Sequence, residues 1–146
     1  AHEKGLTVAL NPSPFSAEIL SWPLECVDIF IVNEIEGGAL SGESVPEKVL
    51  DALRRRFPGA ATVLTLGHDG AMYADQTESF SVPAHRVTVV DTTAAGDTFT
   101  GYFLAMLLRG GTPKDSMEIA AKAAAIAVTR PGAVPSIPRL EETLRQ

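Results

Sequence analysis

At 146 residues the chain has the length of one domain, and 45% hydrophobic against 21% charged residues place it among folded globular proteins. Its 12 Lys and Arg stand against 18 Asp and Glu, so no cationic surplus exists for nucleic acid and we expect no such partner. The single cysteine, Cys26, excludes an internal disulfide and a multi-cysteine zinc cluster, and it predicts a cytoplasmic protein. No apolar stretch approaches the ~20 residues that cross a bilayer, so we expect no membrane association.

The first part of the chain alternates short apolar, β-branched runs with turn residues. Such runs predict buried strands, and the Asn, Pro and Gly residues between them predict turns. Residues 46–57 predict a helix, because apolar residues share one face and Pro58-Gly59 stops it. The predicted strands are residues 6–10, 27–32, 62–66, 71–74, 80–83 and 87–90, and a short helix is predicted at 15–21.

From residue 95 the apolar residues recur with helical spacing. Those from Phe99 to Leu107 share a face and predict an amphipathic helix that ends at Gly110-Gly111. Thr112-Pro113 begins a second helix, whose stripe of small residues lets a neighbouring helix approach closely. A last helix is predicted over residues 139–145. Strands interleaved with helices predict the α/β class.

Residues 90–97, Val-Asp-Thr-Thr-Ala-Ala-Gly-Asp, join a predicted strand to a predicted helix. Such a junction exposes unpaired backbone N–H groups, and the small side chains of Ala94, Ala95 and Gly96 leave room for an oxyanion or phosphate. Asp97 beside such a site suits a general base that takes a hydroxyl proton during phosphoryl transfer. Taken alone, the pattern equally fits a small-residue turn followed by an ordinary acid at a helix start.

Residues 91–99, Asp-Thr-Thr-Ala-Ala-Gly-Asp-Thr-Phe, closely resemble the second signature of the ribokinase-like, or PfkB, carbohydrate kinases. Three more stretches resemble family motifs: residues 33–36, residues 65–70 and residues 125–138, the last most like the ribokinases. The resemblance extends over residues 11–141, which is nearly the whole chain.

The resemblance implies a three-layer, Rossmann-like α/β fold with a mixed sheet and flanking helices. Because members of the family are about twice as long, it also implies that residues 1–146 are the C-terminal nucleotide-binding and catalytic half of such a kinase. The N-terminal half, with the substrate contacts and lid, is then absent. We therefore expect the chain alone to be inactive and to associate with itself or with a missing segment through an uncovered strand edge.

The activity implied by the resemblance is ATP-dependent phosphorylation of a sugar hydroxymethyl group, with D-ribose to D-ribose 5-phosphate the leading reaction. Asp97 would contact the sugar as general base, and the N–H groups of Ala94, Ala95, Gly96 and Asp97 would hold the transferring phosphate. Many relatives have Gly at the position of Ala94, and its Cβ predicts that no positive φ is required there.

Three other interpretations stay open on the sequence. A fructokinase, or an adenosine or other nucleoside kinase, would share the same motifs. A non-catalytic nucleotide-binding fragment would also retain them. A dinucleotide-binding oxidoreductase domain is disfavoured, because no Gly-x-Gly-x-x-Gly follows the first predicted strand.

Asn33 and Glu36 are three residues apart and share a face of a helical turn. An amide and a carboxylate suit a magnesium–water network, with Glu36 reaching Mg²⁺ through water, although an Asn helix cap followed by a surface Glu has the same pattern. The resemblance assigns nucleotide binding to Asn33, Thr65, Gly67, His68, Gly70, Gly96 and Asp97.

Asp91 and the residues after the second predicted helix resemble the monovalent-cation site of the ribokinases. One carboxylate among backbone carbonyls suits K⁺ better than a transition metal, whereas the alternative is a structural carboxylate in an ordinary loop. The cofactors implied are thus ATP, Mg²⁺ and K⁺, and a homodimer is expected for the full-length protein. The proposed cation ligands are Asp91, Thr93, Ala127, Arg130, Gly132 and Ser136.

Overall fold

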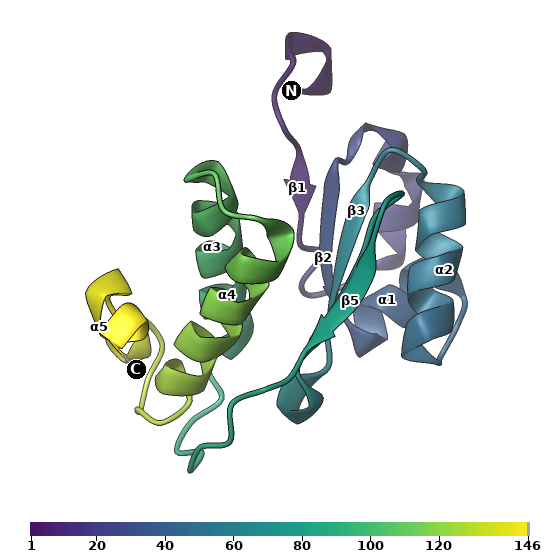
Figure 1. Ribbon diagram of the computed structural model, residues 1–146. Coiled ribbons are helices and arrows are strands. Elements are labelled where there is room, and N and C mark those ends of the chain that lie inside the picture. Colours follow the sequence, from purple (N-terminus) through teal and green to yellow (C-terminus); the bar gives the residue numbers. More distant parts are fainter. Residues whose placement is uncertain (146) are drawn as a thin grey trace. The chain divides into compact units, whose positions relative to one another are not determined.

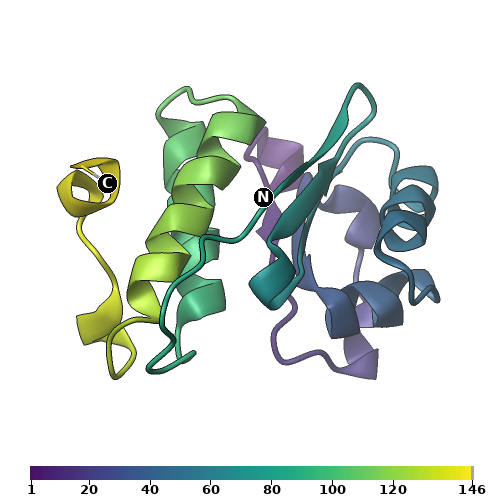
Figure 2. The same cartoon turned by 60° about the horizontal axis from the view of Figure 1, so that its bottom comes forward.

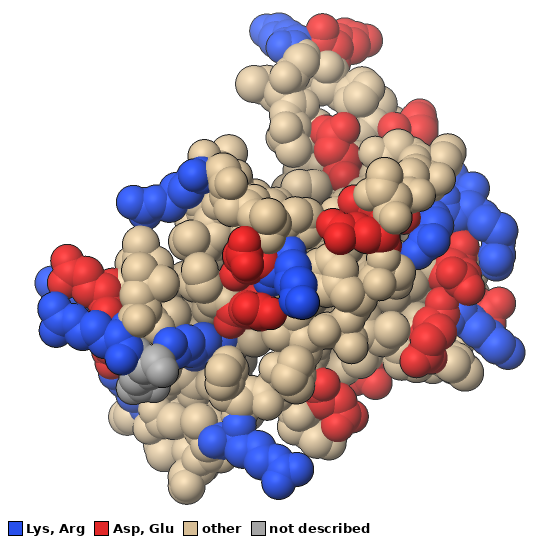
Figure 3. Space-filling model, in the orientation of Figure 1, with Lys and Arg blue, Asp and Glu red and all other residues tan. Residues whose placement is uncertain are grey.

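The computed structural model describes residues 1–145, which divide into two compact units (Figures 1 and 2). The first unit comprises Ala1–Leu66 and Met72–Ser81, and the second comprises Gly67–Ala71 and the chain from Val82 onward. Within residues 1–145, no helix is both long enough and apolar enough to cross a membrane. On the face in Figure 3, blue Lys and Arg side chains are interspersed with red Asp and Glu side chains.

One five-stranded sheet organises the first unit, with its strands adjacent in chain order. The strands are β1 (Ala9–Leu10), β2 (Ile29–Asn33), β3 (Ala61–Thr65), β4 (Ala71–Ala74) and β5 (Ser79–Val82). β1 pairs with β2 and β2 pairs with β3 in parallel. The connections from β3 to β4 and from β4 to β5 are too short for a parallel crossover, so the sheet is mixed, as predicted.

Two helices, α1 (Glu34–Ser41) and α2 (Pro46–Arg56), bury apolar side chains with the strands of the first unit. α2 begins with Pro at its first position, a residue whose missing N–H would be unpaired there in any case. At its end, the Phe57 ring lies 4.9 Å from the Phe30 ring between centroids. Short 3₁₀ helices complete the unit at His2–Lys4, Ala17–Ser21 and Leu24–Cys26.

The second unit is built on two packed helices, α3 (Ala95–Leu108) and α4 (Pro113–Ala127). Phe103, Ala120 and Ala123 are fully buried, and the small side chains let the two backbones approach closely. The Thr112 hydroxyl caps α4 by accepting a hydrogen bond from Asp115 N–H at 3.1 Å. The remaining elements are the 3₁₀ helices Gly67–Asp69 and Val134–Ser136 and the helix α5 (Leu140–Arg145).

The predicted strand at residues 87–90 is wrong. These residues form no strand, and Val89 and Val90 are 57% and 60% exposed. Instead of a neighbouring strand, the carbonyl of Val128 at the end of α4 accepts hydrogen bonds from Val90 N–H at 2.7 Å and Asp91 N–H at 3.2 Å. β-branched residues favour an extended strand locally. A strand also needs a neighbouring strand for its hydrogen bonds, and the local sequence does not show whether one is present.

The first strand is shorter than residues 6–10, because a carboxylate interrupts the pairing. Val8 N–H donates to Asp28 Oδ2 at 2.7 Å, while the Val8 carbonyl accepts from Asp28 and Ile29 N–H groups. Only Ala9–Leu10 continues as β1, and Leu6 is exposed.

Candidate functional site

The N-terminus of α3 has no side-chain cap. Its first intrahelical bond is donated by Thr98 N–H to the Ala94 carbonyl at 2.8 Å, and Ala95 N–H donates to the Thr92 carbonyl at 3.2 Å. The N–H groups of Gly96 and Asp97 therefore lack acceptors within the described part of the chain. Free amides at the positive end of a helix dipole favour an anion such as a phosphate.

The expectation of an ordinary φ at Ala94 is wrong. Ala94 has φ 63° and ψ 9°, in the left-handed region, and among the described non-glycine residues it alone has positive φ. Such a conformation costs an L-residue about 1–2 kcal/mol, because Cβ approaches the following carbonyl. The turn from the preceding loop into α3 imposes it, and the methyl group of Ala is small enough to be accommodated.

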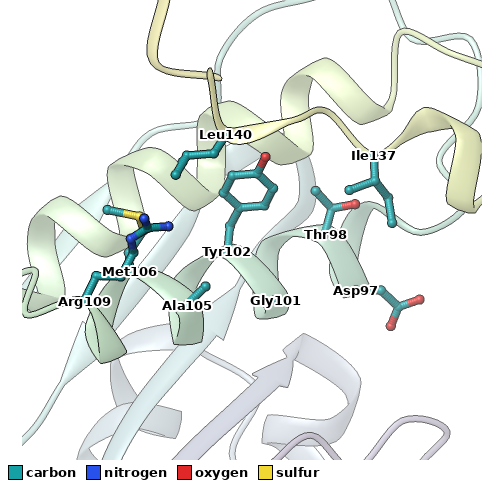
Figure 4. Close-up of a pocket in the computed structure, with 9 residues that line it drawn as sticks. All are labelled: Asp97, Thr98, Gly101, Tyr102, Ala105, Met106, Arg109, Ile137 and Leu140. Atoms are coloured by element: carbon teal, nitrogen blue, oxygen red, sulfur yellow. The ribbon is translucent and has the colours of Figure 1, made fainter. Parts of the chain in front are cut away.

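Asp97 lies at the third position of α3, is exposed, and lines the end of a cavity of about 320 Å³. Figure 4 shows its carboxylate pointing away from the apolar side chains of Ile137 and Leu140. The carboxylate is therefore open to a reacting group from outside the cavity, as proton exchange with a substrate requires. The cavity is lined by Asp97, Thr98, Gly101, Tyr102, Ala105, Met106, Arg109, Ile137 and Leu140.

Asp91 ties the loop before α3 to the loop after α4. Its Oδ1 accepts a hydrogen bond from Thr93 N–H at 2.8 Å, and its Oδ2 accepts one from Gly132 N–H at 2.9 Å. Hydrogen bonds from Thr93, through its side chain and then its backbone, and from Gly132 lower the pKa of Asp91 to about 2. The contacts are therefore fully present above the ordinary pKa of Asp and are lost as pH falls toward 2.

Direct hydrogen bonds join only some of the residues that were predicted to bind the monovalent cation. Asp91, Thr93 and Gly132 are joined as described, and the Ala127 carbonyl accepts from Arg130 N–H at 3.1 Å. Ser136 is fully buried, with its hydroxyl donating to the Ala133 carbonyl at 2.6 Å.

The predicted cation ligands offer oxygen atoms only, from the Asp91 carboxylate, from hydroxyl groups and from backbone carbonyls. Within residues 1–145, no three His, Cys, Asp or Glu side chains gather in a way that could hold a metal ion. A donor set of oxygen atoms suits a hard cation rather than a soft transition metal.

In the first unit, Asn33 and Glu36 form a reciprocal capping box at the start of α1. Asn33 Oδ1 accepts from Glu36 N–H at 2.9 Å, and Glu36 Oε2 accepts from Asn33 N–H at 3.0 Å. The Asn is thus a helix cap, but the Glu is only 3% exposed rather than a surface residue.

Thr65 lies beside this capping box. It is paired with Asn33 in the parallel register of β2 and β3, and its hydroxyl donates to the Val32 carbonyl at 3.3 Å. The three predicted residues Asn33, Glu36 and Thr65 therefore meet at the carboxyl ends of two parallel strands. Ligands of open α/β sheets bind at such ends.

The predicted nucleotide loop contains two glycines with positive φ, Gly67 at +57° and Gly70 at +102°. A Cβ on Gly70 would lie 2.1 Å from the Val82 carbonyl oxygen, so the chain's own backbone requires this glycine. A Cβ on Gly67 would meet open space. His68 is exposed and lies 3.5 Å from Asp69 between Nε2 and Oδ1.

A polar network that no sequence motif indicated holds the C-terminal segment of the second unit. Tyr102 on α3 donates its phenol hydrogen to the Pro138 carbonyl at 2.7 Å, and the Thr143 hydroxyl lies 3.3 Å from that phenol oxygen. Arg130 pairs with Glu142 on α5, and this cation lowers the pKa of the Glu142 carboxyl. Both contacts join residues too far apart for local spacing to reveal them.

Comparison with known proteins places the chain in a family. The profile described as pfkB family carbohydrate kinase matches residues 1–140. Ribokinase of Schizosaccharomyces pombe is 39% identical over 153 residues, with 97% of this chain and 47% of that protein covered. The structure of ribokinase from Cryptococcus neoformans in complex with ADP has a TM-score of 0.85 and 29% identity, with 96% of this chain and 51% of that chain covered. The structure of Arabidopsis thaliana ribokinase complexed with ribose and ATP has a TM-score of 0.83 and 28% identity, with 99% of this chain and 48% of that chain covered.

These similarities have two consequences. The chain spans about half the length of the relatives it matches. The mixed sheet with flanking helices agrees with the ribokinase-type structures, so the predicted fold is confirmed. The chain belongs to the pfkB family of carbohydrate kinases.

Proposed function

We propose that this chain is part of an ATP-dependent sugar kinase, with D-ribose as the leading substrate and D-ribose 5-phosphate as the product. The observation that carries the proposal is the uncapped N-terminus of α3, where the free amides of Gly96 and Asp97 lie beside an exposed carboxylate. Support for the substrates comes from a relative, because the Arabidopsis ribokinase is complexed with ribose and ATP.

In the proposed reaction, the sugar hydroxyl oxygen forms a bond to the γ-phosphorus of ATP while the bond between that phosphorus and the bridging oxygen of ADP breaks. Asp97 accepts the hydroxyl proton, which makes the attacking oxygen a better nucleophile. The free amides of Gly96 and Asp97 stabilise negative charge on the phosphoryl oxygens, whereas the Ala95 N–H is already bonded to the Thr92 carbonyl. Phosphoryl transfer depends chiefly on such positioning and electrostatic stabilisation.

We also propose roles for the remaining predicted residues. Bound Mg²⁺ would offset charge on the phosphates, with Glu36 reaching it through water. K⁺ would be held by oxygens of Asp91, Thr93, Ala127, Arg130, Gly132 and Ser136, and it would order the loop that carries the amides. Nucleotide contacts are proposed for Asn33, Thr65, Gly67, His68 and Gly70.

The direct test is ADP formation by the full-length protein containing this sequence, with each candidate acceptor supplied in turn. D-ribose is expected to support the fastest turnover in a panel with 2-deoxyribose, fructose and adenosine. A faster rate with fructose or adenosine would reassign the substrate within the family. If no acceptor raises ADP formation above the rate without acceptor, the chain is not part of an active kinase of these sugars.

Asp91→Ala is expected to abolish stimulation by K⁺. The wild-type full-length protein should turn over faster in KCl than in choline chloride at matched ionic strength, whereas the variant should show one rate in both salts. Because the pKa of Asp91 is lowered to about 2, its carboxylate stays charged across neutral pH, and the K⁺ response should not depend on pH there. Equal wild-type rates in the two salts would contradict the cation site.

A further inference from the structure

The second unit contains another cavity, of about 380 Å³, and of its lining residues the proposed function uses only Arg130. Its walls come from residues 85–87, from the C-terminal half of α4 and from the residues just after that helix. This volume lies within the range of small-molecule sites, roughly 300–1,000 Å³. The lining residues are His85, Arg86, Val87, Lys122, Ala125, Ile126, Thr129 and Arg130.

Positive charge gathers around this cavity in a chain whose net charge is −6. Arg86, Lys122 and Arg130 line it, and no Asp or Glu does. Arg130 is compensated by its pairing with Glu142. Arg86 and Lys122 have no ion-pair partner among residues 1–145, so two uncompensated cations face the cavity. A group of negative charge would be attracted there.

The carboxyl end of α4 opposes this attraction only in part. Terminal helix carbonyls carry partial negative charge and would repel an anion. Here the Ile126 carbonyl accepts from the Thr129 hydroxyl at 2.7 Å, and the Val128 carbonyl accepts from Val90 and Asp91 N–H groups. Both carbonyls are therefore satisfied by the protein itself.

Besides the cations, the lining contains two polar residues, His85 and Thr129, and three apolar ones, and the apolar residues indicate the body of the ligand. Val87, Ala125 and Ile126 offer carbon surface beside the two cations. Inorganic phosphate alone would leave this surface uncovered, whereas a phosphate ester of a small organic molecule would cover it. Arg binds phosphate oxygens through its planar fork and Lys as a compact charge, so the pair suits a phosphate group.

We propose that this cavity binds a phosphomonoester, with Arg86 and Lys122 holding the phosphate and Val87, Ala125 and Ile126 contacting the organic body. The site is separate from the α3 amides, because none of residues 91–97 lines it. It does not depend on the kinase reaction proposed above. A sugar phosphate and a nucleoside monophosphate share this chemistry, and the experiment distinguishes them.

The test is a titration of the full-length protein containing this sequence with ribose 5-phosphate, AMP or inorganic phosphate, followed by backbone amide NMR, with ribose as the uncharged comparison. A phosphate ester is expected to shift the amides of residues 85–87 and 122–130 with saturation. Lys122→Ala and Arg86→Ala should each weaken binding about tenfold, the loss typical of a charge-assisted contact. Lys114→Ala, an exposed cation in the first turn of the same helix, should leave the affinity unchanged.

Tighter binding of ribose 5-phosphate than of AMP would identify a sugar phosphate as the ligand, and the reverse would identify a nucleotide. Inorganic phosphate binding as tightly as both esters would overturn the role of the organic body. Shifts confined to residues 91–97 would place the anion at α3 and overturn the site. Equal affinity of the Lys122→Ala and Lys114→Ala chains would do the same, provided that both spectra stay dispersed as in a folded protein.

Discussion

Asp97→Asn is expected to lower kcat for sugar phosphorylation by roughly 10²–10⁴-fold, the usual contribution of a general base. The amide has nearly the same shape as the carboxylate but cannot accept the hydroxyl proton. The α3 amides remain in place, so KM for ATP should change much less than kcat. The measurement is the initial rate of sugar-dependent ADP formation by the full-length protein containing this sequence.

The second unit offers a matched control for this change. Asp115 occupies the same third position in α4 as Asp97 does in α3, but its carboxylate accepts a hydrogen bond from the Thr112 hydroxyl at 2.7 Å. Asp115→Asn should leave turnover close to wild type. Near-normal turnover of Asp97→Asn would show that another group takes the proton.

Phe103→Ala is expected to reduce the free energy of unfolding by about 3–5 kcal/mol, as for other large buried aromatic residues. Phe103 is fully buried on α3, and its ring stacks with that of Phe99 at 6.4 Å between centroids. Removing the ring leaves a cavity in the packing that supports the helix carrying Asp97. Urea denaturation followed by circular dichroism measures the loss.

Two companion variants make this stability prediction specific. Leu108→Ala, in the last turn of the same helix and 87% exposed, should change the free energy of unfolding by less than about 0.5 kcal/mol. Phe103→Leu keeps part of the buried volume and should fall between Phe103→Ala and wild type. Similar losses in Phe103→Ala and Leu108→Ala would contradict burial of the Phe103 ring as the source of the effect, because Ala itself favours the helix.

Helix boundaries in the second unit were predictable because their signals are local. The apolar spacing before Gly110-Gly111 and the Thr112-Pro113 start correspond to α3 and α4 as observed. The run at residues 87–90 misled because strand formation depends on a distant partner. At Ala94 the residue type indicated ordinary backbone geometry, whereas the surrounding turn imposed a left-handed one.

Spacing within a motif predicted proximity but not the hydrogen bonds that result. Asn33 and Glu36 do share the first turn of α1, yet their side chains bond to each other's backbone N–H groups. The contact of Asp91 with Gly132 spans 41 residues, so only family resemblance could indicate it. Arg86 and Lys122 likewise meet at one cavity through the fold, without any periodic pattern that joins them.

The Asp91 bridge has an electrostatic consequence for the second unit. It lies where the packing of α3 on α4 brings the amino end of one helix beside the carboxyl end of the other, so opposite poles of two helices are neighbours. The electrostatic potential therefore changes from positive, at the amino end of α3, to negative, at the carboxyl end of α4, across the two loops that Asp91 joins. A neutral side chain at position 91 would therefore do more than delete one charge: it would remove the side-chain hydrogen bond that joins the loop before α3 to the loop after α4.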